Sequence, residues 1–159
     1  MIDWIYLYVQ QTMQPDEIEH KFTQSSDLSS RGKFDESIEL IASYISDDIE
    51  NKDLLTNILY LMGHNYWKTG HYEEAKSYYS KAQAILKENG IYKKLPAVVN
   101  SLGLYQRKSG NYRDALIHFL EGLLYAFQFD DKRAMIAITG NIGMVMLSLI
   151  HISEPTRPY

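Results

Sequence analysis

Apolar residues recur at the spacing of one helical face along most of the chain. Between Asp35 and Ile45 they lie at Ile38, Ile41, Ala42 and Ile45, which is the i, i+3, i+4, i+7 pattern of an amphipathic helix. The pattern predicts helices over residues 15–30, 35–45, 53–69, 72–89, 94–109, 112–129 and from 131 onward. We find no segment with the period-two alternation of a strand, so the sequence predicts an all-α protein.

Glycine and proline mark the ends of these helices. The turns Thr69-Gly70-His71 and Ser109-Gly110-Asn111 are short and centred on glycine, so each predicts an antiparallel helix hairpin. Pro15 and Pro96 suit the first turn of a helix, where no amide hydrogen is needed. Asp130 or Asp131 is suited to cap the last helix.

Two stretches of the chain superimpose on each other. Residues 62–82 lie over residues 102–122, and a third copy begins near residue 141. The matched positions in the three copies are Gly63, Gly70, Tyr72, Ala75 and Tyr79, then Gly103, Gly110, Tyr112, Ala115 and Phe119, then Gly143. A fixed period of about 40 residues is typical of stacked helical repeats, in which each unit covers the apolar face of its neighbour.

The repeated positions have a physical interpretation that needs no family name. Gly63, Gly103 and Gly143 have no side chain, so another helix can approach closely there. Ala75 and Ala115 are small enough to meet that approach. The repeated aromatic residues fill the space between helix pairs, each contributing about 1.5–3 kcal/mol if buried. We therefore predict that this stripe is core.

These positions resemble the pattern of the tetratricopeptide repeat. The first copy reads Leu59, Met62-Gly63, Tyr66, Gly70, Tyr72, Ala75, Tyr79 and Ala82, and the second departs from the pattern at Gln106 and Gly122. The resemblance implies a right-handed α-solenoid of antiparallel helix hairpins. The period, about 40 residues, exceeds the usual repeat of about 34 residues, and such long units are similar to those of bacterial signalling proteins.

The repeats divide the chain into segments. We expect an N-terminal segment at 1–14, a degenerate repeat at 15–52, repeats at 53–92 and 93–130, and the start of a further, truncated repeat at 131–146. The degenerate copy precedes the next one by a slightly shorter offset. In it Gly32, Phe34 and Ile41 are in register, while Ser25 and Ser37 occupy the small positions.

The last segment, 147–159, is expected to be a non-native tail. Residues 147–157, LSLIHISEPTR, resemble the in-frame translation of a sequencing adapter. This interpretation makes the chain part of a longer protein whose visible portion stops at about Met146. The alternative is that Leu147–Ile152 continues the preceding helix.

Composition and charge limit the kinds of partner that the chain is expected to bind. The net charge is −4, which argues against the cationic surface that nucleic-acid binding requires. There is no cysteine, which excludes disulfides and thiolate metal sites. The apolar run Trp4–Val9 is too short for a membrane span, and we expect no later stretch to approach one. We predict a cytoplasmic protein, or a periplasmic one if an upstream signal precedes the sequence.

The resemblance implies that ligands lie in a concave groove formed by the first helices of successive repeats. Carried over by position, the groove residues are Asn57, Tyr60, His64, Trp67, Lys68, Asn100, Leu104, Arg107 and Lys108, with Ala97 and Met144 beside them. A cationic rim next to Tyr60 and Trp67 suits a peptide that carries acidic groups. The alternative is that the lysines are ordinary solvated residues and that Trp67 packs at a junction between repeats.

Catalytic chemistry has no comparable signal. The five histidines show no spacing typical of a metal site, and no glycine-rich phosphate loop follows a strand. We therefore predict no metal, no cofactor and no enzymatic activity in this region. The expected function is that of a protein- or peptide-binding scaffold, as the sensing region of a longer bacterial signalling protein. The alternatives are a peptide-responsive regulator, or the regulatory region of a histidine kinase or nucleotide cyclase.

Overall fold

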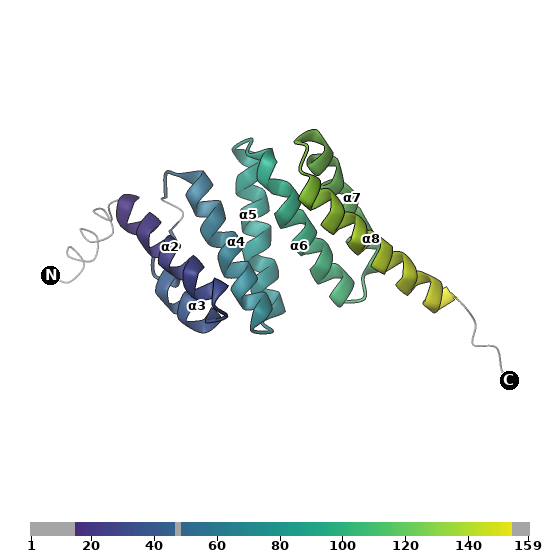
Figure 1. The fold of residues 1–159 in the computed structure, drawn as a ribbon, viewed down its shortest axis with the longest axis horizontal. Helices are drawn as coiled ribbons and strands as arrows, with labels where there is room; N and C mark the ends of the chain where they lie inside the picture. Colours follow the sequence, from purple (N-terminus) through teal and green to yellow (C-terminus); the bar gives the residue numbers. More distant parts are fainter. Residues whose placement is uncertain (1–14, 47–48, 154–159) are drawn as a thin grey trace.

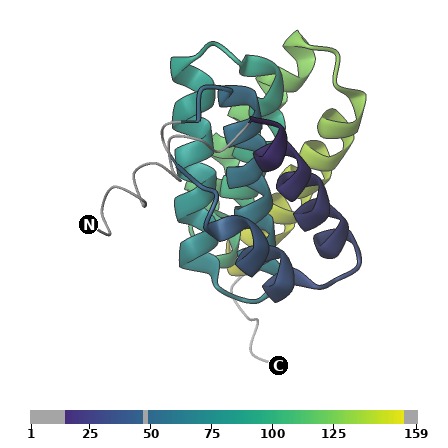
Figure 2. The same ribbon diagram turned by 90° about the vertical axis from the view of Figure 1, so that its left-hand side faces the viewer.

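The fold is a row of antiparallel helix pairs. A computed structural model describes residues 15–46 and 49–153, and these residues form seven α-helices and one short 3-10 helix. The α-helices are α2 (Pro15–Ser30), α3 (Phe34–Ala42), α4 (Lys52–Lys68), α5 (Tyr72–Glu88), α6 (Leu95–Lys108), α7 (Tyr112–Gln128) and α8 (Lys132–Ser153), and η1 (Tyr92–Lys94) leads into α6. Figure 1 shows the pairs side by side along the long axis of the molecule, and Figure 2 views the row from its α2–α3 end. The predicted all-α solenoid is confirmed.

The helix ends lie close to the predicted ones, with two differences. The second helix ends at Ala42 rather than Ile45, and the 3-10 turn of η1 precedes α6. The turns within the hairpins depend on Gly70 and Gly110, whose φ angles are +87° and +78°, a conformation that glycine adopts without steric cost. Asp131 caps α8, since its Oδ1 accepts a hydrogen bond from the backbone N–H of Ala134 at 3.0 Å.

The helices of the hairpins α4–α5 and α6–α7 meet at the repeated glycine. A Cβ atom at Gly63 would lie 2.5 Å from the Tyr79 ring, and one at Gly103 would lie 2.5 Å from the Phe119 ring. Ala75 and Ala115 are fully buried. The core is thus built from contacts that only small residues permit on one helix and that large residues fill from the other.

Helix α8 corrects one expectation from the sequence. Residues 132–152 are long and apolar enough to cross a membrane, by length and composition only, with a mean hydropathy of 1.8. The expectation that no stretch approaches a span was wrong because the sequence interpretation set aside everything after Met146. The helix continues through Leu147 to Ser153. Residues 1–14, predicted as a separate segment, lie outside the described residues.

Candidate functional site

The face lined by α4, α6 and α8 contains a hollow of about 300 Å³. Its lining residues come from the first helices of three successive repeats and from the turn before α8: Tyr60, Pro96, Ala97, Asn100, Asp131, Arg133, Ala134, Ala137 and Ile138. Ala97 and Ala137 are equivalent positions in successive repeats. The hollow forms because the side chains at these two positions are short. The equivalent position on α4 carries the longer Asn57.

Two polar side chains of the hollow, Asn100 and Tyr60, contact residues outside its lining. The Asn100 Oδ1 accepts a hydrogen bond from Asn141 Nδ2 at 2.8 Å, which ties α6 to α8. The Tyr60 ring packs against the Tyr79 ring, with 5.6 Å between centroids. Arg133 is exposed and forms no ion pair with another described residue. A ligand in the hollow would therefore meet one tyrosine, one amide, the carboxylate of Asp131 and one guanidinium group without an ion pair to a described residue.

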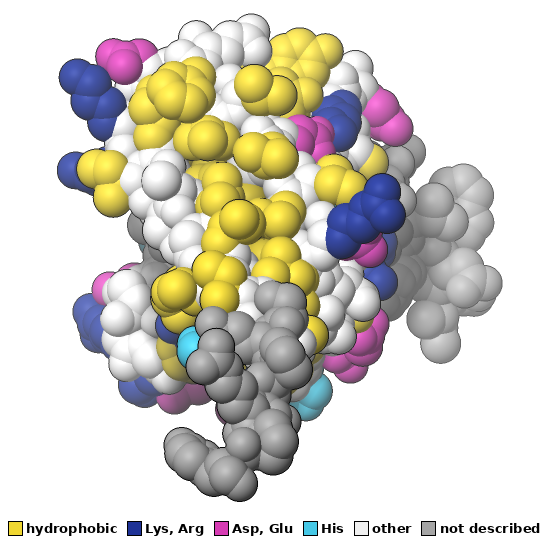
Figure 3. All heavy atoms as spheres, turned by 90° about the vertical axis from the view of Figure 1, so that its right-hand side faces the viewer, with side chains coloured by type: hydrophobic (Ala, Val, Ile, Leu, Met, Phe, Trp, Pro, Cys, Tyr) yellow, Lys and Arg dark blue, Asp and Glu magenta, His cyan; other side chains and the backbone are white. Residues whose placement is uncertain are grey.

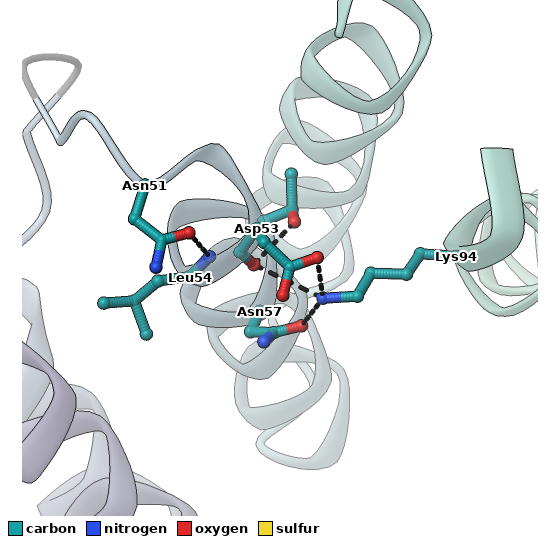
Figure 4. A network of polar contacts seen from close by, with 6 residues as sticks. Asn51, Asp53, Leu54, Asn57 and Lys94 are labelled. Atoms are coloured by element: carbon teal, nitrogen blue, oxygen red, sulfur yellow. Dashed lines mark hydrogen bonds and ion pairs between the residues drawn. The ribbon is translucent and has the colours of Figure 1, made fainter. Parts of the chain in front are cut away.

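Asn57, one of the predicted groove residues, belongs to a polar network at one end of α4 and α6. The Lys94 Nζ lies 2.6 Å from Asp53 Oδ1 and donates to Asn57 Oδ1 at 2.7 Å. Asn51 caps α4 beside them by accepting a hydrogen bond from the Leu54 N–H at 3.0 Å (Figure 4). The network joins two hairpins and engages the Asn57 side chain. No periodic signal pointed to Lys94, because its partners lie one repeat away on a different helix.

Trp67 and Lys108 share one neighbour. The Trp67 ring meets the edge of the Tyr72 ring at 5.0 Å between centroids, and the Lys108 Nζ lies 4.2 Å from the centre of that same ring. Trp67 is partly buried against the core. A cation over an aromatic face contributes about 0.5–1 kcal/mol at an exposed site. Both side chains therefore have structural contacts within the fold in addition to any contact with a ligand.

The remaining groove residues differ in how available they are. His64 is half-buried with its ring edge-on to Phe34 at 6.3 Å, and burial, followed by the charge of Lys68, lowers the pKa of His64. Leu104 is partly buried against the core cluster of Ala115, Phe119, Ile138 and Val145. Lys68 and Arg107 form no ion pair with another described residue, and they leave two cationic groups open to a ligand.

Within residues 15–46 and 49–153, no cluster of three or more His, Asp or Glu side chains is arranged to hold a metal ion. What the structure shows of the candidate site is its shape, its aromatic ring and its charged groups.

Comparisons with known proteins bear on the fold and on one repeat. Residues 56–85 match the tetratricopeptide repeat family. The crystal structure of BtubC (BKLC) from P. vanneervenii is similar, with a TM-score of 0.72 and 21% identity over 87% of this chain. That similarity shows the fold, and this chain spans 57% of the length of BtubC. A search of curated proteins gives no match.

The matched family is a repeat family rather than a catalytic one. A region of this kind is a general scaffold for protein interaction. The chain thus contains a tetratricopeptide repeat at residues 56–85, set in an all-α solenoid of antiparallel helix pairs.

Proposed function

We propose that the chain binds a protein or peptide partner along the face lined by α4, α6 and α8. The observation that supports this most directly is the hollow of about 300 Å³ between these helices. Concave sites with small apolar floors and a few polar groups are where ligands bury most surface. Tyr60 offers an aromatic wall and Asn100 an amide, both within the hollow.

The charges around this face favour an acidic partner. Arg133 at the hollow and Lys68 and Arg107 along the groove are cationic groups without an ion-pair partner among the described residues. Hydrogen bonds between such groups and carboxylates are about twice as strong as neutral ones. We therefore propose a peptide segment that inserts a small apolar side chain into the hollow and places Asp or Glu beside it.

A peptide-display selection tests this proposal. Peptides selected on the wild-type chain are expected to be rich in Asp and Glu and to lose binding to the Ala97→Phe variant, because the new ring fills the hollow. Ala84→Phe is the matched control, since Ala84 is an exposed alanine on α5 outside the hollow. Equal binding to Ala97→Phe and wild type, with both variants folded, would reject the proposed surface.

We also propose a context for this binding: the cytoplasmic sensing region of a longer bacterial signalling protein. The long repeat period supports it through its similarity to repeats of that kind. The alternatives are a peptide-responsive regulator and a region that regulates an enzyme domain, a histidine kinase or a nucleotide cyclase. Recovering the uninterrupted reading frame separates them, because a catalytic domain after residue 146 would select the last.

A further inference from the structure

One face of α7 is both apolar and exposed. Ile117, Leu120, Leu124 and Phe127 are 56%, 53%, 71% and 64% exposed. They follow one another at spacings of three and four residues, which places them in one line along the helix. We call these four residues the α7 stripe. The other sides of α7 pack against α6 and α8, and more than half of the surface of each stripe residue is left to solvent.

The exposure of the α7 stripe does not depend on its place near the end of the row. The equivalent positions on α5 are Ser77, Ser80, Ala84 and Lys87, and all four are exposed although the complete hairpin α6–α7 follows α5. Of the four, Lys87 reaches the following hairpin, where its Nζ lies 2.7 Å from Glu121 Oε1, and it remains exposed. A following hairpin therefore leaves this face of the preceding helix open. Repeat packing accounts for small and polar residues at this face of α5 but not for the large apolar residues of α7.

Figure 3 shows apolar side chains gathered over the end of the molecule that α7 and α8 form. The part that belongs to α8 has an explanation within the fold, because α4 and α6 pack a second helix on the equivalent face. The α7 stripe has no such explanation, since its equivalent on α5 stays exposed beside a complete hairpin. An exposed apolar patch that the fold does not explain marks an interaction surface.

Opposite charges stand at the two ends of the α7 stripe. Arg113 lies one turn before Ile117 on the same face, and Asp130 follows the other end of α7; both charged residues are exposed. Neither forms an ion pair with another described residue. The dipole of α7 disfavours a cation at its beginning and an anion at its end. An antiparallel neighbouring helix reverses both effects, because its ends have the opposite sign.

We propose that two copies of the chain associate through the α7 stripe, with their α7 helices antiparallel. Centring the pair near position 122 sets Leu120 opposite Leu124 of the second copy. Arg113 and Asp130 then lie about 13 Å and about 12 Å from the centre, at a rise of about 1.5 Å per residue, so each Arg113 lies level with Asp130 of the other copy. A two-fold axis repeats every contact, which makes the α7 stripe complementary to itself.

Two other occupants fit the α7 stripe less well. A membrane surface favours a broad apolar face flanked by cations, whereas the stripe is a narrow seam bordered on one side by Asp114 and Glu121. A different protein would have to supply an anion and a cation at the spacing that a second copy already carries. The interface is separate from the hollow, whose lining includes no residue of α7, so the dimer and the binding of a peptide are tested independently.

Sedimentation velocity of the full chain tests the dimer. Between about 1 and about 100 μM we expect a monomer–dimer equilibrium. Leu124→Ser should raise the dimer dissociation constant about 100-fold, since each dimer loses two leucine contacts that contribute a factor of about ten each. The matched control is Ile136→Ser on α8, because Ile136 and Leu124 are 76% and 71% exposed. The control should change the dissociation constant less than about twofold, and neither variant should lower the melting temperature at concentrations where the chain is monomeric.

Charge reversal tests the antiparallel arrangement. Arg113→Glu sets two carboxylates against each other at both ends of the pair, so it should raise the dissociation constant about fivefold or more at low salt. Adding Asp130→Lys to that variant should restore the wild-type value within about twofold. The φ of +52° at Asp130 disfavours lysine within the monomer, and the melting temperature of Asp130→Lys alone measures that cost separately. In a parallel pair Arg113 would face Arg113, and Arg113→Glu would leave the dissociation constant unchanged.

Four results would overturn the proposal. The first is a wild-type chain that stays monomeric up to about 100 μM. The second is a dimer that Leu124→Ser leaves intact or that Ile136→Ser dissociates, which would place the interface on α8. The third is an Arg113→Glu variant that dimerises as the wild type does, which would exclude the antiparallel pair. The fourth is sedimentation of the chain with phosphatidylcholine vesicles that Leu124→Ser abolishes and Ile136→Ser does not, which would identify a lipid surface as the occupant.

Discussion

The hairpins α2–α3 and α4–α5 bring their helices together at the same repeat positions, but different residue types stand at those positions. In α4–α5 the small positions are Gly63 and Ala75, and Tyr79 packs onto the glycine. In α2–α3 the equivalent small positions are Ser25 and Ser37, whose hydroxyl oxygens lie 2.7 Å apart. One close approach is filled by an aromatic ring, and the other is held by hydrogen bonds.

The difference extends to how the first hairpin is attached to the second. Asn65 of α4 is fully buried, donates to Ser37 Oγ at 2.7 Å, and accepts from Ser29 Oγ at 2.6 Å. The residue equivalent to Tyr79 is Ile41, also fully buried. A branched aliphatic side chain at that place is smaller than an aromatic ring, which leaves room for the serine hydroxyls. The comparison shows that this fold requires small residues at the crossing point and accepts either apolar or polar filling around them.

The largest expected effect comes from filling the glycine of an aromatic-closed hairpin. Gly103→Val places its Cβ about where the Phe119 ring lies, 2.5 Å from the nearest ring atom, and Phe119 is fully buried. We expect a loss of about 3 kcal/mol or more in unfolding free energy, at or beyond the upper end of the range for overpacked cores. Urea unfolding followed by circular dichroism measures it.

Gly143→Val is the matched control for this prediction. The same substitution on α8 meets no atom within 4 Å, so the unfolding free energy should change by less than about 0.5 kcal/mol. Equal losses for the two variants would show that a cost common to both sites, rather than the contact with Phe119, sets the loss, since valine has a higher helix propensity than glycine. The contrast between a glycine that packs on a ring and one that does not would then lose its physical basis.

The aromatic-closed hairpins were predictable from sequence, and the polar junction was not. Superimposing the two repeats aligns Gly63 with Gly103 and Tyr79 with Phe119, because a close helix approach permits few residue types. Ser25 and Ser37 stood out only as departures from that pattern. The hydrogen bond that ties Ser37 to α4 comes from Asn65, which lies on another helix, and periodicity within one helix cannot reveal such a partner.

The candidate site also contains some residues that the sequence predicted and others that it did not. The repeat register placed Tyr60, Asn100 and Ala97 on the first helices, and these residues line the hollow. The same register gave no account of Asp131 and Arg133, which reach the hollow from the turn before α8 and its first residues. It also left out Lys94, which engages Asn57. Side chains that cross between repeats are set by three-dimensional packing, which the pattern of a single repeat does not contain.

A second prediction breaks the polar junction. Asn65→Leu removes both hydrogen bonds of a buried amide and leaves the Ser29 hydroxyl without its acceptor. Leaving buried polar groups unpaired costs about 1–3 kcal/mol, and we expect a loss of unfolding free energy in that range. Hydrogen exchange should show the added opening in α2 and α3 rather than in α6 and α7.

The control for the polar junction is Ser25→Ala. Ser37 keeps the Asn65 donor and the Ser25 carbonyl acceptor at 2.7 Å, so the loss should be smaller, about 0.5–1.5 kcal/mol. If Asn65→Leu proved as stable as the wild type, packing of the leucine side chain would stabilise the junction as much as the hydrogen bonds do. The two hairpins would then differ in sequence without differing in stability.

The smallest expected effect is a titration that reports on the same junction. His64 lies edge-on to Phe34 of the first hairpin, and burial first, then the charge of Lys68, lowers the pKa of His64 below 6.5. Because the unfolded chain binds the proton more readily, His64 carries no penalty well above pH 6.5, and the unfolding free energy falls as the pH drops from 6.5 toward the folded pKa. Proton NMR of the His64 ring measures the pKa directly. Phe34→Ala exposes the ring to water and should raise the pKa more than Lys68→Met does, since burial is the larger cause. A greater rise with Lys68→Met would show that charge, and not the packing of the first hairpin on α4, controls this histidine.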